Sequence, residues 1–291
     1  MIGQVTAQGA FEVIFDGGET TRLGRGLHKG KTLDPVSIQT SIAVLKRFAS
    51  QCEGEGVQKI ACVGTNALRT AVDADQFIHL VQSECDITPR VIDEKEEAVL
   101  SYLSVKHDPL LPSDAVVMDV GGGSTEYIFR HDENSSDDLK AISLPVGAVG
   151  LTEQFLFHNP PSQHEVQKLQ DEIEKPLRSI PLDLQGALVG IGGTAVTLGS
   201  MHLGLDAFDR EKIHDLRLTI NDLRTQVREL QEKNLAARKE IKGLPPDRAD
   251  IILAGSLIIL ATMERLQKDT LHISAHGLRY GLFYQEFLNT G

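Results

Sequence analysis

The sequence predicts an α/β protein of two domains, in which helices pack on parallel or mixed sheets and the domains face each other across a cleft. Short apolar segments typical of strands alternate with helical stretches along the whole chain. The 291 residues suffice for two domains, since a domain has roughly 100–200 residues. Each half begins with strands, which places the domains at residues 1–114 and 115–291, with the last helix packing back on the first domain.

The first half opens with two extended segments separated by Gly9, which predict a strand, a turn and a second strand. Asp34 followed by Pro35 supplies a helix N-cap and a first-turn proline, and apolar residues recur behind them at helical spacing. Residues 59–63, KIACV, are apolar and predict a buried strand. The predicted strands are residues 2–5, 11–15, 59–63 and 90–92, and the predicted helices are residues 35–54, 74–84 and 94–106.

In the second half, apolar strands again alternate with helices. The longest apolar run, residues 251–263, is too short for a membrane span of roughly 20 residues, so it predicts a buried core helix. The polar run 131–138 predicts a loop. The predicted strands are residues 115–118, 127–129, 141–149, 187–191, 216–220 and 271–274, and the predicted helices are residues 151–157, 165–178, 194–202, 222–233 and 248–266.

Charge and cysteine content exclude several classes of protein. There are 29 Lys and Arg residues against 41 Asp and Glu residues, a net charge of −12, and a field of that sign disfavours non-specific nucleic-acid binding. Three cysteines without a C-x-x-C pair, and an N-terminus unlike a signal peptide, predict a cytoplasmic protein without disulfides or a membrane partner. Residues 20–33 hold four basic residues and no acid, which indicates a solvated loop or a polyanion contact.

A glycine turn after the strand at 115–118 is the strongest chemical motif. Three consecutive glycines permit positive φ and leave bare amides that can wrap an anion, whereas a plain hairpin turn needs one or two. An acid at the strand end is well placed to hold Mg²⁺, which binds carboxylates together with substrate phosphates. The turn leads into a strand and lacks the lysine of a P-loop. Its residues are Asp119, Gly121, Gly122, Gly123, Ser124 and Glu126.

A second glycine turn joins the strand at 187–191 to the following helix. Its residues Gly192, Gly193 and Thr194 place amides and a helix N-terminus where phosphate can bind. The spacing also fits the dinucleotide fingerprint G-x-G-x-x-A. That fingerprint requires a strand ending in an acid about 20 residues later, and the segment LGLDAFDREK found there is not a strand. The turn therefore favours phosphate over a dinucleotide.

Two further segments carry polar groups directly after predicted strands. Thr65, Asn66 and Arg69 offer a hydroxyl, an amide and a guanidinium, which suit phosphate contact but also fit a helix cap with a surface arginine. Acids open the helix at residue 94; they complement the helix dipole and can also orient a water for attack on phosphorus. His272 and His276 have metal-like spacing without an obvious third ligand, and we interpret them as structural.

Together these motifs resemble the exopolyphosphatase and guanosine pentaphosphate phosphatase family. The motif MDVGGGSTE and its distance from EKEEA are the most specific parts. The resemblance implies a two-domain actin-like, sugar-kinase-like fold of the ribonuclease H-like class. The matching segments are RLGRGL at 22–27, GTNALR at 64–69, EKEEA at 94–98, MDVGGGSTE at 118–126, GIGGTA at 190–195, RADIILAG at 248–255 and SAHGLRYGL at 274–282.

The resemblance implies Mg²⁺-dependent hydrolysis of the terminal phosphoanhydride of polyphosphate, or of the 5′ end of guanosine pentaphosphate, by a homodimer. It implies that Glu97 is the general base that activates water, and that Asp119 and Glu126 place the metal and the water. The phosphate-binding residues that it implies are Thr65, Asn66, Arg69, Gly121, Gly122, Gly123, Ser124, Gly192, Gly193 and Thr194, with Arg22 and Arg279 as further polyanion contacts.

One departure from the family pattern concerns the N-terminus. Members usually begin with a strand and a D-x-G-S-N-S hairpin, so we expect the first domain, which starts at MIGQV, to lack its first strand and first phosphate hairpin. We also expect a short form without the additional C-terminal helical domains of longer members. The alternative function is a non-catalytic regulator that binds phosphate or nucleotide. A sugar kinase would need a sugar pocket, for which the sequence gives no signal.

Overall fold

The computed structural model describes residues 1–6, 11–19, 21–27, 32–130 and 139–288. The chain forms two units: unit 1 comprises Met1–Leu100 with Leu282–Gly291, and unit 2 comprises Ser101–Gly281. The chain first passes between the units inside helix α5 (Glu94–Lys106), rather than at the expected boundary after residue 114. A boundary inside a continuous helix has no proline- or glycine-rich linker to mark it in the sequence.

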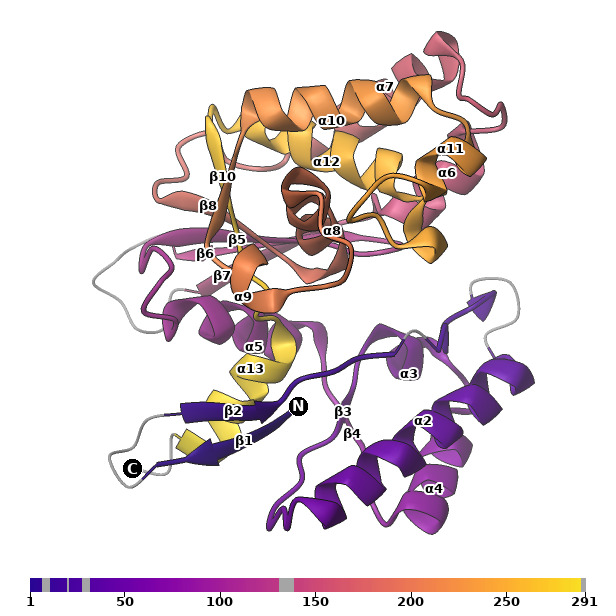
Figure 1. Ribbon diagram of the computed structural model, residues 1–291, viewed down its shortest axis with the longest axis vertical. Coiled ribbons are helices and arrows are strands. Elements are labelled where there is room, and N and C mark those ends of the chain that lie inside the picture. Colours follow the sequence, from indigo (N-terminus) through magenta and orange to yellow (C-terminus); the bar gives the residue numbers. More distant parts are fainter. Residues whose placement is uncertain (7–10, 20, 28–31, 131–138, 289–291) are drawn as a thin grey trace. The chain divides into compact units, whose positions relative to one another are not determined.

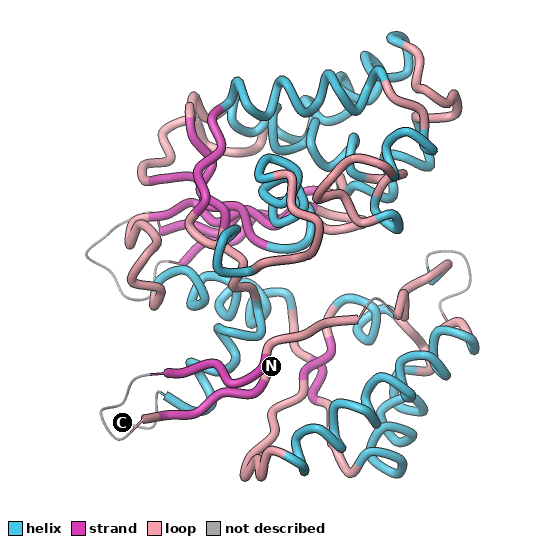
Figure 2. The backbone as a smooth tube through the Cα atoms, viewed as in Figure 1, coloured by secondary structure: helices cyan, strands magenta, loops and turns pink. Residues whose placement is uncertain are grey.

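A six-stranded sheet with the order β7-β6-β5-β8-β10-β9 is the centre of unit 2 (Figures 1 and 2). Strands β5, β8 and β10 run parallel to one another, whereas β6, β7 and β9 pair antiparallel. The apolar runs of β5 and β8 are buried almost throughout, as expected for strands with neighbours on both sides. The strands are β5 (Ala115–Val120), β6 (Thr125–Arg130), β7 (Leu139–Leu144), β8 (Ala187–Ile191), β9 (Leu216–Thr219) and β10 (Thr270–Ile273).

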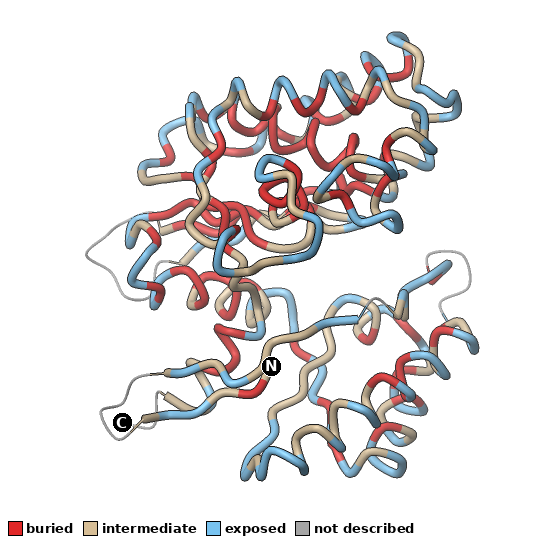
Figure 3. The backbone as a smooth tube through the Cα atoms, viewed as in Figure 1, coloured by how far each residue is buried: buried red, intermediate tan, exposed pale blue. Residues whose placement is uncertain are grey.

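Helices pack on this sheet around α12 (Ile252–Arg265), which contacts α6, α7, α8 and α10. Nearly every residue of α12 is buried, which confirms the predicted core helix, and Figure 3 shows the buried backbone gathered here. Capping boxes at Ser162 and Thr219 define where α7 and α10 begin. The other helices of unit 2 are α6 (Ala148–Phe155), α7 (Gln163–Leu177), α8 (Gly192–Leu203), α9 (Arg210–Ile213), α10 (Ile220–Glu232), α11 (Leu235–Lys239) and a 3-10 turn at Pro246–Arg248.

Unit 1 holds two short strand pairs, which form two separate two-stranded sheets (Figure 2). β1 (Ile2–Val5) pairs antiparallel with β2 (Phe11–Phe15), and β3 (Val63–Gly64) pairs parallel with β4 (Arg90–Val91). Asp34 caps the helix that follows it by accepting a hydrogen bond from the Ser37 amide. The helices are α2 (Pro35–Gly54), α3 (Asn66–Thr70), α4 (Ala74–Cys85), the start of α5, and the end of α13 (Leu278–Phe283) with a π-helical turn at Tyr284–Leu288.

Two predicted strands differ from the structure. Residues 59–63 form a strand only from Val63, none of the five is buried, and Ile60 is 51% exposed. An apolar run is buried as a strand only where neighbours cover it, and β4 is the one strand paired with β3 in the described chain. Residues 141–149 also divide, because β7 ends at Leu144 and α6 begins at Ala148. The predicted loop at 131–138 and part of the basic stretch, Thr20 and residues 28–31, lie outside the described residues.

Candidate functional site

The two glycine turns of unit 2 lie at one edge of its sheet. β5 and β8 are adjacent and parallel, and their register places Asp119 opposite Ile191. The turn at residues 121–124 follows β5, and helix α8 follows β8 directly at Gly192. Because carboxyl ends of parallel strands meet at the same edge, the structure brings the two predicted phosphate-binding turns together.

The first turn is fixed by close packing against the start of α6. The carbonyl oxygens of Gly121 and Gly122 accept hydrogen bonds from the amides of Ala148 and Val149, each at 2.9 Å. A Cβ atom at Gly147 would lie 2.5 Å from the backbone of Gly122. None of the three glycines of the turn has a positive φ, although the sequence argument allowed for one. Close backbone approach therefore requires glycine at position 147, whereas Cβ atoms at Gly121 and Gly122 would lie 3.2 Å from their nearest neighbours.

The amides of this turn are available to a ligand. Within the described chain, the N–H groups of Gly122, Gly123 and Ser124 have no hydrogen-bond acceptor, and both glycines are exposed. A Cβ atom at Gly123 would meet nothing within 4 Å. Three adjacent N–H donors beside open space form the kind of concavity that binds an anion.

Two carboxylates stand next to these amides. Asp119 on β5 lies directly opposite Glu126 on β6 in the antiparallel register, so both side chains are on one face of the sheet. Glu126 accepts hydrogen bonds from the hydroxyls of Ser124 at 2.5 Å and Ser143 at 3.0 Å. Asp119 packs against the second turn, since a Cβ atom at Gly192 would lie 2.2 Å from its Oδ1 atom. Paired carboxylates beside an anion-binding turn are the donor set that Mg²⁺ prefers in proteins.

Helix α8 presents an uncapped N-terminus at the second turn. Its N-cap residue, Ile191, makes no side-chain hydrogen bond, so the first-turn amides have no side-chain cap. The hydroxyl of Thr194 donates to the carbonyl oxygen of Val120 at 2.9 Å, and the residue is 3% exposed. The predicted phosphate contact of Thr194 is therefore restricted to its backbone amide, while its side chain ties α8 to the end of β5.

Arg248 is a further residue of the site, and no role is predicted for it from the sequence. Its guanidinium packs on the second turn, since a Cβ atom at Gly193 would lie 2.2 Å from Nη2 of Arg248. The 3-10 turn that carries Arg248 follows Pro245, and the side chain is partly exposed. The segment RADIILAG contains this arginine, but nothing in its spacing places it beside a turn more than fifty residues earlier in the chain. A guanidinium there adds the positive charge that a phosphate ligand needs.

In unit 1, the predicted general base and a predicted phosphate contact form an ion pair. Arg69 donates to the Oε2 atom of Glu97 at 2.6 Å and to the carbonyl oxygen of Ile92 at 3.0 Å. The two side chains are 21% and 30% exposed. They meet because β3 and β4 are parallel, so that α3 and α5 both begin at the same edge. Among the described residues no donor contacts the Oε1 atom of Glu97, which leaves that oxygen open to solvent.

The remaining predicted residues contribute less. Thr65 precedes α3 without capping it by its side chain, and Asn66 accepts a hydrogen bond from Thr70. Arg22 adopts a left-handed φ of 53° in a turn of unit 1. Arg279 is exposed on α13 in unit 2.

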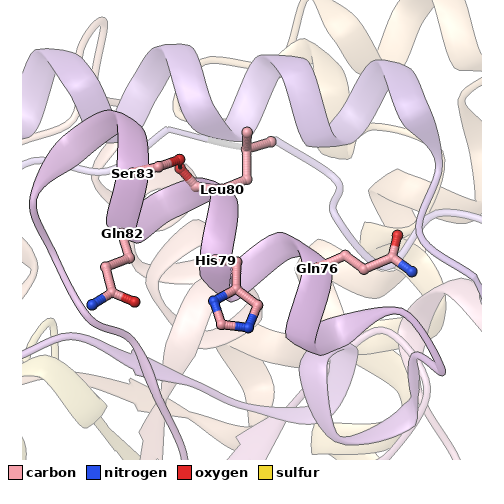
Figure 4. Close-up of a pocket in the computed structure, with 5 residues that line it drawn as sticks. All are labelled: Gln76, His79, Leu80, Gln82 and Ser83. Atoms are coloured by element: carbon pink, nitrogen blue, oxygen red, sulfur yellow. Dashed lines mark hydrogen bonds between the residues drawn. The ribbon is translucent and has the colours of Figure 1, made fainter.

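A shallow hollow beside α4 contains none of these residues. Figure 4 shows that its lining comes from this one helix, and it includes His79 and Leu80 between polar side chains. Side chains from a single helix face without convergent charged groups do not make a catalytic site. Among the described helices, none is long and apolar enough to cross a membrane.

The mixed sheet of unit 2, with two glycine turns and a carboxylate pair at its carboxyl edge, agrees with the actin-like α/β class that the sequence predicts. The chain belongs to the Ppx/GppA phosphatase family, whose model matches residues 1–290. A crystal structure of the Aquifex aeolicus family member superposes with a TM-score of 0.85 and 31% identity, covering 99% of this chain and 94% of that one. The expected family and actin-like fold are thereby confirmed.

Several relatives of the chain have a phosphatase activity in their names. The chain is 27% identical over 295 residues to Exopolyphosphatase 2 of Mycobacterium tuberculosis, covering 97% of this chain and 91% of the relative. It is 26% identical over 270 residues to a guanosine-5′-triphosphate,3′-diphosphate pyrophosphatase of Photobacterium profundum, covering 91% and 52%. It is 29% identical over 265 residues to a bifunctional 3-dehydroquinate synthase/phosphatase of Fusobacterium nucleatum, covering 88% of this chain but 39% of that protein.

Proposed function

We propose that this protein hydrolyses the terminal phosphoanhydride bond of inorganic polyphosphate, of guanosine pentaphosphate, or of both. The observation that carries the proposal is the carboxylate pair Asp119 and Glu126 at the sheet edge that also bears both glycine turns. Membership of a phosphatase family with an exopolyphosphatase and a guanosine-5′-triphosphate,3′-diphosphate pyrophosphatase among its relatives supports the same reaction class.

The residues of unit 2 would bind and polarise the phosphate. The amides of the first turn and of the α8 N-terminus would donate to phosphate oxygens, and Arg248 would add positive charge. Asp119 and Glu126 fit a magnesium ion, because they are two carboxylates on one face of adjacent strands. Charge neutralisation on the phosphate oxygens is the chemistry that Mg²⁺ supplies when bound.

The residues of unit 1 would activate water. The ion pair with Arg69 holds Glu97 through Oε2 and so fixes where Oε1 points. A carboxylate oxygen oriented in this way can accept the proton of a water molecule as that water attacks phosphorus. Arg69 therefore orients the general base Glu97, in addition to any contact that it makes with phosphate.

Phosphate release with and without the base tests this proposal. Purified protein is assayed with Mg²⁺ on long-chain polyphosphate and, in parallel, on guanosine pentaphosphate. Glu97→Gln should lower the rate by at least about 100-fold, since a positioned general base contributes about that much or more. Glu96→Gln is the matched control, because Glu96 is the neighbouring residue of α5 and pairs with Arg90 instead. Equal rates for the two variants would contradict the role given to Glu97.

A phosphate-binding regulator without turnover is the second candidate. It is favoured by the Arg69–Glu97 ion pair, because the guanidinium occupies one oxygen of the carboxylate that would activate water. Calorimetric binding of polyphosphate without release of phosphate would establish this function and exclude the hydrolase.

A further inference from the structure

A buried cluster in unit 2, away from both glycine turns, centres on Asp108. Its carboxylate is 3% exposed, and its Oδ2 atom accepts a hydrogen bond from Nδ1 of His276 at 2.6 Å. Nε2 of His214 lies 3.0 Å from the same oxygen, within ion-pair range although poorly aligned for a hydrogen bond. The other oxygen, Oδ1, accepts from the amide of Leu110 at 3.0 Å. Asp108 is therefore the shared acceptor of the cluster.

Ring stacking extends the cluster into α13. The ring of His276 lies between those of His214 and Tyr280, with centroids 4.0 and 3.8 Å away. Tyr280 is fully buried, and its hydroxyl accepts a hydrogen bond from Arg210. Three stacked rings and one carboxylate thus form a single packed group.

Two observations argue that this cluster is not a metal site, although its three ligand-type atoms lie within 4.8 Å of one another. Nδ1 of His214 accepts from the amide of Ala275 at 3.3 Å, so its proton is on Nε2 and no lone pair faces Asp108. An ion bound by two imidazoles lies in the plane of both rings. The rings of His214 and His276 are stacked with only 22° between their planes, which therefore do not meet at the cluster.

The place of this cluster in the chain suggests its role. The chain passes between the units twice, once between Leu100 and Ser101 in α5 and once between Gly281 and Leu282 in α13. Asp108 follows the first passage, shortly after α5 ends, whereas His276 and Tyr280 precede the second. The Asp108–His276 bond therefore joins, inside unit 2, the two segments that lead to unit 1.

A second contact joins the same two segments. Ser104, on α5 and fully buried, reaches the carbonyl oxygen of His276 at 3.5 Å. Ser274 closes the loop before α13 by donating to that same oxygen at 2.9 Å. The C-terminal part of α5 is thereby held against the loop that starts α13.

We infer that Asp108 and His276 are positioning residues: they form a clasp that fixes the C-terminal part of α5, and through this helix the orientation of Glu97. The inference rests on the proposed function for the role of Glu97. Glu97 lies in the first turn of α5, and a rigid secondary element can carry energetic coupling from one end to the other. The clasp acts on the rate of the chemical step and not on substrate binding.

Asp108→Asn tests the clasp, because it exchanges the shared acceptor for an amide group of the same size. Glu165→Gln is the matched control, since Glu165 is also a buried carboxylate of unit 2 that contacts a histidine, at 2.8 Å from His158. Hydrogen exchange should become about tenfold faster in residues 101–108 and 274–281 of Asp108→Asn, and stay unchanged there in Glu165→Gln. The kcat for phosphate release should fall about tenfold in Asp108→Asn, with KM within about twofold of the wild type.

His276→Phe gives the same test if Asp108→Asn does not fold. Phenylalanine retains the ring between His214 and Tyr280 and removes only the donor to Asp108. Wild-type exchange in both segments, or a change in KM alone, would overturn the inference. Failure of the proposed function is a separate result: wild-type protein would release no phosphate, and the exchange measurement would still decide whether the clasp exists.

Discussion

Gly192 offers the sharpest test of how tightly the site is packed. Its φ of +77° is unfavourable for any residue with a Cβ atom. A Cβ atom there would lie 2.2 Å from Oδ1 of Asp119, whereas ordinary contacts begin at 3.4 Å. In Gly192→Ala the carboxylate must therefore move by about 1.2 Å, a displacement of the size that costs about 100-fold in rate.

Gly204→Ala separates backbone strain from this displacement. Gly204 ends the same helix, α8, with a φ of +58°, and a Cβ atom there would meet nothing within 4 Å. We expect Gly204→Ala to lower the free energy of unfolding by about 1–2 kcal/mol through strain alone. Gly192→Ala should lower it by about 2–5 kcal/mol, because overpacking adds about 1–3 kcal/mol to the strain.

Urea unfolding and phosphate release, both at a temperature where the variants are folded, measure these effects. Gly192→Ala should release phosphate about 100-fold more slowly than Gly204→Ala, which should remain within about twofold of the wild type. The reasoning is refuted if the two variants lose stability as expected but release phosphate at similar rates, because Asp119 would then tolerate displacement.

Two further predictions concern stability. Thr194→Val leaves the buried carbonyl of Val120 without its hydroxyl donor, so urea unfolding should show a free energy of unfolding lower by about 1–3 kcal/mol. Phosphate release should stay within a few-fold of the wild-type rate. A loss of rate as large as in Gly192→Ala would mean that the hydroxyl contacts the ligand. Burial alone would raise the pKa of Asp108, but the close imidazole of His214 and the hydrogen bonds that Asp108 accepts from His276 and from a backbone amide hold that pKa well below its usual range. Since its pKa is lower folded than unfolded, Asp108 stabilises the fold above about pH 4 and loses that effect as the pH falls further. The urea midpoint should therefore drop more steeply below about pH 4 in the wild type than in Asp108→Asn, and parallel curves would contradict this.

Features set by neighbouring residues could be read from the sequence. The Asp34–Pro35 start of α2 and the acid-rich start of α5 depend on contacts within one helical turn, and both appear where predicted. The two glycine turns were also predictable, because strand alternation alone implies that the ends of β5 and β8 share an edge.

Features that depend on residues far apart in the chain could not be predicted from the sequence. Apolar content predicted that residues 59–63 are buried, but burial depends on which strands flank them, and Ile60 is half exposed. The Arg248 guanidinium reaches Gly193, and Arg69 reaches Glu97, only through tertiary packing. The hydroxyl of Thr194 could donate to phosphate, but in the fold it donates to the carbonyl oxygen of Val120.

The rate of phosphate release by Asp119→Asn is the most direct test of the proposed function. The exchange keeps the size of the side chain and its place opposite Glu126 but removes its charge. Wild-type protein should release phosphate from polyphosphate or guanosine pentaphosphate in the presence of Mg²⁺. Asp119→Asn should be slower by at least about 100-fold, because electrostatic groups at the reacting centre contribute about that much or more. Release by Asp119→Asn at the wild-type rate would show that the carboxylate pair between the glycine turns is not the catalytic centre.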